Sequence, residues 1–462
     1  MKMNDTLLLG VSRKIITPKV GGKLMGYQPD LRSESVNDDL TACVYYFKEG
    51  ATKALLVSAS LCGIGTDICN GLRREISERF DIPYEAMIIH TFHTHSGPTL
   101  MNISGWGEAD YEYLEEILRP QLMEAVAEAI DTAEPVTMAV ASGDSLVGVN
   151  RREITVKNHI NLGQSPWGPF DPQMTVISFK NDEGKRVANL IHYGAHPTAS
   201  GMNKEITRDW PGPMMDAVEE IFGGVTAFFN GPEGDVGPRL IGGKTTGGFN
   251  AEGKFENHVK YALRHGALAA QDAVKIAHTA SGYSRAHLTV STYTIDIPVK
   301  KRLSIEEATA IYEENKQYTA NLPARKAAYA KGVLESYENG YEEITSRPFT
   351  QTAVMIGDVV FVTFPFELFS EIGLRIRRAS KIPYTLTLAL SNGVSCYFPT
   401  ETEINRCAVP GYEVESFKVG DVQPYVDNAD FTLVRESLNH LASLGYERHP
   451  QKAFEFDENA TK

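Results

Sequence analysis

The amino-acid sequence predicts an α/β protein in which layers of mixed β-sheet are flanked by helices. The first 285 residues alternate short apolar segments with longer segments of helical periodicity, which is the pattern of α/β proteins. The later residues add an alternating, β-branched segment and a hairpin pattern, which indicate further strands. At 462 residues the chain exceeds the roughly 250–300 residues at which one core usually stops growing. Two domains or one large unit are therefore expected.

The N-terminal block, residues 1–285, is expected to contain most of the strands. Strands are predicted at residues 54–58, 87–94, 136–142, 174–179, 187–196 and 225–229, and helices at residues 67–80 and 110–133. The second helix has the clearest pattern, because apolar side chains recur at helical spacing from Leu114 to Ile130. Pro120 predicts a kink within it, since proline cannot donate a backbone hydrogen bond.

The C-terminal block, residues 286–444, is expected to mix strands and helices. Ser304 and Glu307 form a capping-box pattern that opens a polar helical region reaching about residue 340. Gly357 and Asp358 predict the turn of a hairpin. The predicted strands are residues 287–297, 354–356, 359–364 and 384–390, and a helix is predicted at residues 368–379. Residues 445–462 form a polar tail, which we expect to be peripheral.

The charge and composition exclude several functions. The formal charge of −14 argues against nucleic acid and against docking to anionic lipid, both of which need a surplus of basic residues. No apolar segment is long enough for a secretory signal or a membrane span, which predicts a cytoplasmic protein without membrane insertion. The five cysteines form no CxxC pair, so neither a disulfide framework nor a cysteine zinc site is expected. A small-molecule substrate fits this composition, and a homo-oligomer is compatible with it.

Two histidines, His93 and His95 in FHTHSGP, lie at the end of the strand predicted at residues 87–94. Strand geometry places side chains two residues apart on one face, so both imidazoles can meet a ligand at the loop that follows. The pair alone is equally compatible with two structural histidines. The pattern is not that of metallo-β-lactamases, because Ser96 follows where further Asp and His ligands are needed. It is not that of barrel amidohydrolases either, because at least one strand and one helix precede it.

Three further segments end a predicted strand or turn with a side chain able to ligate a metal. They contain His196 in GAHPT, Glu367 in PFELF and Tyr397 in SCYFPT. Pro197 restricts His196 to an extended backbone. Taken singly, Glu367 is also explained as a charge at a helix start, and Tyr397 as half-buried packing. Only the combination favours a metal site, and it draws on both blocks, which favours one large catalytic unit.

The order of these motifs resembles the neutral ceramidase family. The matching segments are GVSRKIITPKVGGKLMGY, FHTHSGP, NRR, GAHPT, GPEGDVGPR, PFELF and CYFPTETE, with GYE at residues 411–413. The resemblance spans the chain to about residue 416. It implies a single neutral-ceramidase-like catalytic domain over residues 1–444, followed by the tail.

The resemblance also implies roles for individual residues. The zinc ligands would be His93, His196, Glu367 and Tyr397. The catalytic residues would be His95, Arg151, Asp235 and Tyr412, the last from a loop with three extra residues. His95 would bond the zinc-bound water or the substrate carbonyl, and Arg151 would bind a substrate oxygen. Such a Zn²⁺ site keeps an open position and lowers the pKa of its water to ~7.

Two departures from the family bear on the substrate. Gly237 follows Asp235 and Val236 where ceramidases carry a serine that activity needs, and the chain ends where ceramidases continue into a β-sandwich domain. These differences predict a smaller, more polar substrate than ceramide. The leading hypothesis is a zinc-dependent hydrolase that uses zinc-bound hydroxide to attack a carbonyl of a small soluble metabolite, whether amide, lactone or ketone. The alternatives are an N-acyl-lipid or ceramide-type amidase, a C–C hydrolase of an inositol-derived cyclic diketone, and a non-catalytic zinc-binding protein.

Overall fold

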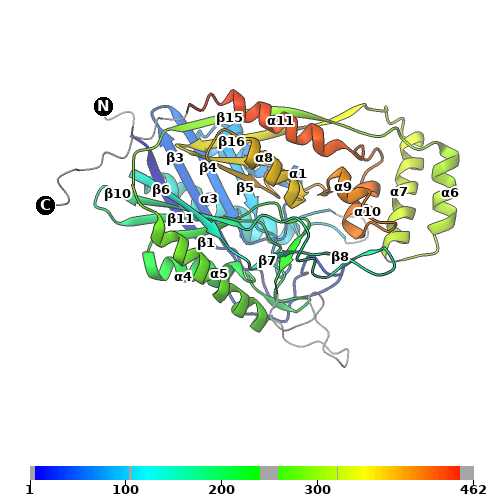
Figure 1. Cartoon of the computed structure of the whole chain (residues 1–462), viewed down its shortest axis with the longest axis horizontal. Helices are drawn as coiled ribbons and strands as arrows, with labels where there is room; N and C mark the ends of the chain where they lie inside the picture. The colour runs from blue at the N-terminus through cyan, green and yellow to red at the C-terminus, as the bar shows by residue number, and fades with distance from the viewer. Residues whose placement is uncertain (1–5, 103–106, 240–258, 320, 448–462) are drawn as a thin grey trace.

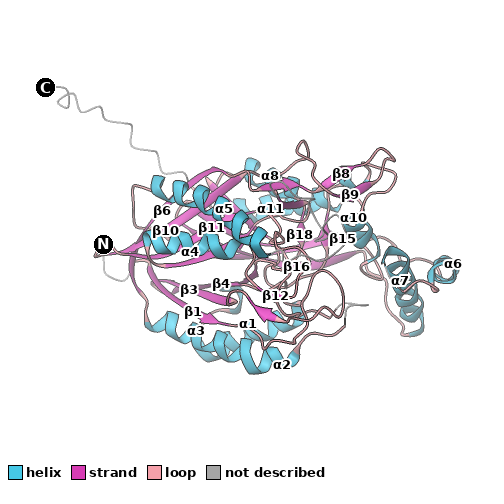
Figure 2. Cartoon of the chain, turned by 90° about the horizontal axis from the view of Figure 1, so that it is seen from below, coloured by secondary structure: helices cyan, strands magenta, loops and turns pink. Residues whose placement is uncertain are grey.

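The computed structural model describes residues 6–102, 107–239, 259–319 and 321–447. Most of the predicted tail, residues 448–462, lies outside this range. Within it the protein is built from two mixed sheets with helices on their outer faces (Figures 1 and 2). This is the layered α/β architecture that the sequence predicts.

The larger sheet has eight strands among the described residues, and its central members come from distant parts of the chain. Its order is β13 (Val225–Asn230), β11 (Arg186–Tyr193), β10 (Gln173–Asn181), β6 (Glu134–Asp144), β1 (Leu8–Ile15), β3 (Thr41–Glu49), β4 (Thr52–Ala59) and β5 (Met87–Thr91). Strand pairs β4–β5 and β11–β13 are parallel and the others antiparallel. Strands β1 and β3 were not predicted from the sequence.

One face of this sheet is covered by helices and the other by the second sheet. Helices α1 (Thr66–Phe80) and α3 (Arg119–Asp131) pack on one half, and α4 (Pro211–Phe222) and α5 (Val259–Thr279) on the other. Side chains of β3 alternate between the two faces: Val44 packs among the helices, whereas Tyr45 faces the second sheet. This alternation follows from the two-residue period of a strand. It gives the sheet a core on each side.

The second sheet has the order β15 (Leu288–Pro298), β16 (Ser346–Ile356), β17 (Val359–Thr363) and β19 (Tyr384–Leu388). Phe361 of β17 packs with Phe229 of β13, so both blocks contribute to one core between the sheets. Val360 faces the other way, toward α8 (Ser370–Ala379) and α11 (Ala429–Ser443). The predicted hairpin is confirmed, and Gly357 in its turn has φ of 58°.

The helical predictions hold with two corrections. The predicted kink near Pro120 is a π-helical turn, Leu114–Leu118, directly before α3. The polar helical region divides into α6 (Ile305–Asn315) and α7 (Asn321–Glu338), and the capping box of Ser304 and Glu307 is present. These two helices project from the layered body in both views (Figures 1 and 2). No helix among the described residues combines the length and the apolar character needed to traverse a bilayer.

Candidate metal centre

The candidate ligands are carried by chain segments that leave the sheets. Strand β5 ends at Thr91, three residues earlier than predicted, and the chain bends so that the His93 N–H donates to the carbonyl of Leu61 at 2.9 Å. His93 has φ of 77°, a left-handed conformation that is rare for a residue with a side chain. The expectation that His93 and His95 share a strand face is therefore wrong. Their rings nevertheless meet, with centroids 4.8 Å apart.

The His196 and Glu367 segments also differ from their predicted elements. Strand β11 ends at Tyr193 rather than at His196, whose N–H donates to the carbonyl of Val236 at 3.0 Å. Glu367 does not open a helix. It lies in the two-residue strand β18 (Glu367–Leu368), paired with Tyr397 in β20 (Tyr397–Phe398).

Three of the predicted ligands converge. The Nε2 atoms of His93 and His196 lie 3.3 and 3.2 Å from Oε2 of Glu367. The ligand atoms of the three residues all lie within 4.8 Å of one another. Both histidines are buried, so the cluster is shielded from bulk solvent. Two imidazoles and a carboxylate are a ligand set that zinc prefers.

The hydrogen bonds of the two histidines set which ring nitrogen carries a proton. Nδ1 of His93 lies 2.6 Å from the carbonyl of Cys62, and Nδ1 of His196 lies 2.8 Å from the carbonyl of Glu233. Because a carbonyl oxygen only accepts, both Nδ1 atoms must donate. In neutral rings the Nε2 lone pairs then face the Glu367 carboxylate. Lone-pair atoms so close together repel one another unless a proton or a cation lies between them, and two imidazoles with a carboxylate suit a divalent metal ion.

The pKa values of the His93 and His196 rings are shifted in opposite directions. Burial and the nearby Arg151 lower the pKa of His196 to about 3, so that ring is neutral. Burial also acts to lower the pKa of His93, but the Cys62 thiol and the Glu367 carboxylate outweigh it and raise that pKa. A divalent cation among the same atoms would oppose protonation of His93 and favour the ligating form.

His95 lies beside the ligands. Its Nε2 is 3.2 Å from Nε2 of His93, and burial together with the neighbouring His93 lowers its pKa well below the ordinary value. The loop before β2 (Ser35–Val36) covers its other side: a Cβ at Gly26 would lie 2.3 Å from Cγ of His95. Tyr27 meets the His95 ring edge-on, with centroids 4.9 Å apart.

Tyr397, Tyr412 and Arg151 form one hydrogen-bonded group. Nη2 of Arg151 donates to both phenolic oxygens, at 3.2 Å to Tyr397 and 2.7 Å to Tyr412, and the two hydroxyls are 3.1 Å apart. The Tyr397 ring lies nearly parallel to that of His196, with centroids 6.5 Å apart. Burial raises the pKa of both tyrosines, which keeps the phenols protonated where no metal ion binds.

A buried charge network holds Arg151. Its Nε donates to Oε1 of Glu413 at 3.2 Å, while Oε2 of Glu413 accepts from Nη1 of Arg152 at 2.8 Å. Arg152 also donates from Nε to Glu403 at 2.8 Å. Arg152 and Glu413 are 0% and 1% exposed, so these charges are stabilised by one another rather than by water.

Asp235 links the glycine-rich segment GPEGDVGPR, residues 231–239, to neighbouring elements by hydrogen bonds. One of its oxygens accepts from the Ser370 backbone N–H at 2.6 Å, and the other from Nδ2 of Asn150 at 3.1 Å and from the Ser370 hydroxyl at 3.0 Å. Burial raises its pKa to about 7, although the Ser370 N–H opposes that shift. These contacts join β7 (Gly148–Asn150), β14 (Val236–Pro238) and the start of α8.

The site residues that were given no role in the sequence analysis include Tyr27, Cys62, Glu233 and Glu413. Three of them belong to motifs that carry the family resemblance, so motif membership was the available signal. Cys62 has no such signal, because it contacts His93 only through the bend after β5.

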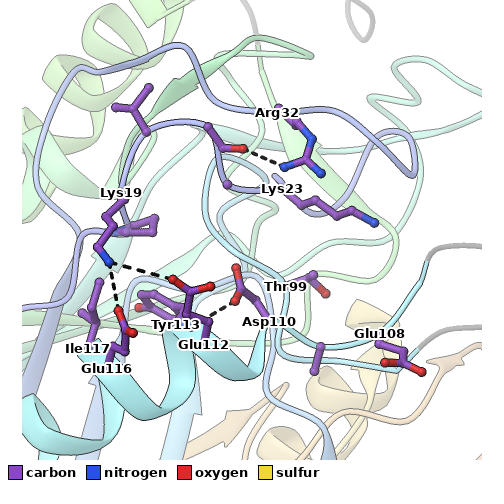
Figure 3. Close-up of a pocket in the computed structure, with 15 residues that line it drawn as sticks. Lys19, Lys23, Arg32, Thr99, Glu108, Asp110, Glu112, Tyr113, Glu116 and Ile117 are labelled. Carbon is purple, nitrogen blue, oxygen red and sulfur yellow. Dashed lines mark hydrogen bonds and ion pairs between the residues drawn. The ribbon is translucent and has the colours of Figure 1, made fainter.

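A surface cleft of about 600 Å³ lies apart from this centre (Figure 3). It is lined by Pro18–Lys23, Arg32 and residues near α2 (Tyr111–Tyr113), and none of the predicted site residues lines it. Its two lysines are paired within the protein: Lys19 lies 2.9 Å from Glu116 and 3.9 Å from Glu112, and Lys23 lies 3.3 Å from Asp30. Because the candidate ligands lie elsewhere, we assign the proposed chemistry to the buried cluster.

No protein-family model matches the sequence, and no curated protein sequence matches it. Two solved structures have a similar fold. The neutral ceramidase from Pseudomonas aeruginosa superposes with a TM-score of 0.71 and 17% sequence identity, over 97% of this chain and 76% of that chain. A ceramidase complexed with C2 gives a TM-score of 0.71 and 17% identity over 96% and 75% of the two chains. The predicted fold is therefore confirmed: the chain has a neutral-ceramidase-like fold.

Proposed function

We propose that the protein is a zinc-dependent hydrolase that cleaves the amide bond of an N-acyl compound. The convergence of His93, His196 and Glu367, with both Nε2 lone pairs facing the carboxylate, is the observation that carries the proposal. The similarity to solved ceramidase structures favours the amidase hypothesis over a general carbonyl hydrolase of small metabolites.

The residues present fit a catalytic zinc ion. His93, His196 and Glu367 would hold it, and Tyr397, which pairs with Glu367 across β18 and β20, is the proposed fourth ligand. When bound, zinc supplies Lewis acidity and activates water for attack on a carbonyl. Its charge would also favour loss of the Tyr397 proton, against the effect of burial.

The other side chains would handle protons and charge around the substrate. His95 is neutral, so its Nε2 can take a proton from a water molecule and later pass it to the leaving amine. Arg151 and Tyr412 offer N–H and O–H donors for negative charge that develops on the carbonyl oxygen. Asp235 would contribute by holding the loop that carries Glu233 and Val236, whose carbonyls contact His196.

The proposal is tested by metal content together with turnover. We expect about one zinc ion per chain by mass spectrometry, and release of free amine from N-acyl amides that chelation abolishes and zinc restores. His287→Ala serves as the control, because His287 is 71% exposed at its side chain and far in sequence from the ligands. Protein that binds no zinc and is unaffected by chelators would contradict the proposal.

Other outcomes separate the alternatives. Stoichiometric zinc without turnover of amides, lactones or cyclic diketones would favour a non-catalytic zinc-binding protein. A second candidate function, hydrolysis of a small polar carbonyl compound, is favoured by polar side chains near the ligands: Arg151 and Glu233 are buried, and Tyr412 accepts a hydrogen bond from Arg151. Amides that differ only in acyl length distinguish the two, since a lipid amidase should gain from longer chains.

A further inference from the structure

Exposed large apolar side chains concentrate around one short hairpin. Val156 is fully exposed and Trp167 is 97% exposed, the two highest values among the large apolar side chains of the described residues. Three more exposed side chains lie nearby, and we call the set of five the hairpin patch: Ile154, Val156, Leu162, Trp167 and Val409. None of the five is a predicted site residue. Apolar surface gathered in this way marks a site of interaction with another molecule.

The backbone of the hairpin brings these side chains together. Strands β8 (Arg152–Ile154) and β9 (Ile160–Leu162) pair antiparallel, and their register puts Ile154 and Leu162 on one face. The first N–H of β9 donates to the carbonyl of Val409 at 2.9 Å, so Val409 lies beside the hairpin. Figure 2 shows β8 and β9 at the edge of the molecule, away from the two large sheets.

Turns hold the two most exposed side chains in solvent. Val156 lies in the turn between β8 and β9. Trp167 lies in a second turn, in which the Gly168 N–H donates to the Ser165 carbonyl at 2.9 Å. The Ser165 N–H donates to the carbonyl of Asn150 at 2.8 Å, which fastens this turn to the buried end of β7. The side chains are thus presented on an ordered backbone, and covering them would gain hydrophobic free energy.

The surface around the hairpin is free of net charge, although the chain as a whole is acidic. The exposed charged side chains of residues 146–167 are Glu153 and Lys157, one of each sign, whereas the whole chain carries −14. Two copies of the chain repel one another over most of their surfaces, but not here. In a two-fold contact, Glu153 of one copy can meet Lys157 of the other, and the reverse contact follows by symmetry. The face is therefore complementary in charge to itself.

The apolar area of the hairpin patch matches what a dimer needs. Covering Trp167 removes about 200 Å² from water, and the four aliphatic side chains at their exposures add roughly another 200 Å². A standard interface buries about 800 Å² on each partner, of which about 57%, or roughly 450 Å², is apolar. The patch supplies the apolar share of one such interface. An anionic lipid surface fits less well, because the acidic chain would be repelled by it.

We propose that the hairpin patch is the interface of a two-fold homodimer in which Trp167 of each copy packs on the aliphatic side chains of the other. The contact would lie directly on the segment that carries Arg151, because the Arg151 carbonyl accepts from the Gly163 N–H, just after β9, at 2.8 Å. The dimer is independent of the proposed reaction, so its tests need no substrate.

The first test removes the apolar side chains that contribute most. Wild type should dimerise with a dissociation constant in the micromolar range or below, measured by sedimentation velocity over a series of concentrations. The double variant Trp167→Ser, Val156→Ser should raise that constant on the order of 100-fold, because each loss counts twice in a two-fold contact. Both side chains are exposed, so the variant should fold, which circular dichroism checks.

Phe431→Ser is the control for the first test. Phe431 is 54% exposed but lies in α11, outside the hairpin patch, so the dissociation constant should not change. A wild type that stays monomeric at about 100 μM would overturn the proposal, as would a dimer that the double variant leaves unaffected. A monomeric wild type that floats with phosphatidylcholine vesicles would assign the patch to a lipid surface instead.

The second test uses the charges beside the patch. Glu153→Lys alone and Lys157→Glu alone should each weaken the homodimer, because like charges then meet across the two-fold axis. Mixing the two variants should restore association as a heterodimer, in which both contacts again pair opposite charges. Two weakened variants that fail to associate when mixed would overturn the two-fold arrangement.

Discussion

Two buried polar clusters meet at this site, and they differ in how completely their groups are partnered. In the arginine cluster, Arg151, Arg152 and Glu413 bond one another at 2.8 to 3.2 Å, so every member has an opposite charge beside it. In the ligand cluster, the Nε2 atoms of two histidines converge on one oxygen of the Glu367 carboxylate, at 3.3 and 3.2 Å. The arginine cluster is complete in the protein alone and can hold donors in place. The ligand cluster can be completed by a cation, and the proposed chemistry is assigned to it.

The largest effect should come from breaking the ligand cluster. His93→Ala removes a metal ligand, so zinc content should fall to near zero and kcat/KM by about 10³-fold or more, since the metal contributes several kcal/mol to the transition state. Inductively coupled plasma mass spectrometry and an amine-release assay measure the two. His90→Asn is the control, because His90 lies in β5, three residues before His93, and is not one of the proposed ligands. Full zinc occupancy in His93→Ala would refute the assignment of that ligand.

Breaking the arginine cluster should affect stability more than metal binding. Glu413→Ala leaves Arg151 and Arg152 without their shared carboxylate, which should cost about 3–5 kcal/mol of unfolding free energy. Urea unfolding followed by circular dichroism measures this, with zinc content as the second readout. Glu415→Ala, on the same helix α10 (Tyr412–Val419) but less buried, is the control and should change stability by about 0.5 kcal/mol or less. Equal effects from the two variants would show that the cluster does not stabilise the fold.

His95 lies beside the ligand cluster, and its variants test whether it transfers a proton or binds the metal. His95→Ala should keep zinc, because His93, His196 and Glu367 remain, but should lower kcat by roughly 100-fold if His95 moves a proton. The His95→Gln variant, which keeps a polar side chain without an imidazole, should lose activity similarly. An unchanged kcat with full zinc would remove the proton-transfer role and leave His95 as packing for Tyr27.

The sequence located the ligand segments well but not their geometry. Short motifs at strand ends predicted which parts of the two blocks meet, and the structure brings His93, His196 and Glu367 together. The conformation of His93 was not predictable, because its φ of 77° is imposed by a hydrogen bond to Leu61, far from it in sequence. Local periodicity carries no information about such a contact.

Local sequence patterns also did not predict strand β1 or the burial of Glu233. Strand β1 contains Ser12, Arg13 and Lys14, and these polar residues conceal a central strand whose Arg13 pairs with Glu219. Glu233 stands in a glycine-rich loop, where a carboxyl group is ordinarily exposed. Only the packing of that loop on β18 makes it buried and unpartnered. Both features depend on tertiary contacts rather than on local pattern.

The smallest expected effect concerns Gly237, which the motif resemblance aligns with a serine of ceramidases. Its backbone lies beside the arginine cluster: a Cβ there would lie 3.5 and 3.7 Å from Cβ and Cδ of Arg151, which is ordinary van der Waals contact. Gly237→Ser should therefore fold normally, with a stability change within about 0.5 kcal/mol. Because the proposed mechanism takes proton transfer from His95 and hydrogen-bond donors from Arg151 and Tyr412, kcat should change less than about tenfold. Gly237→Ala separates the added hydroxyl from the added carbon. A much larger gain in kcat for serine than for alanine would show that the hydroxyl does chemistry here that the present side chains do not.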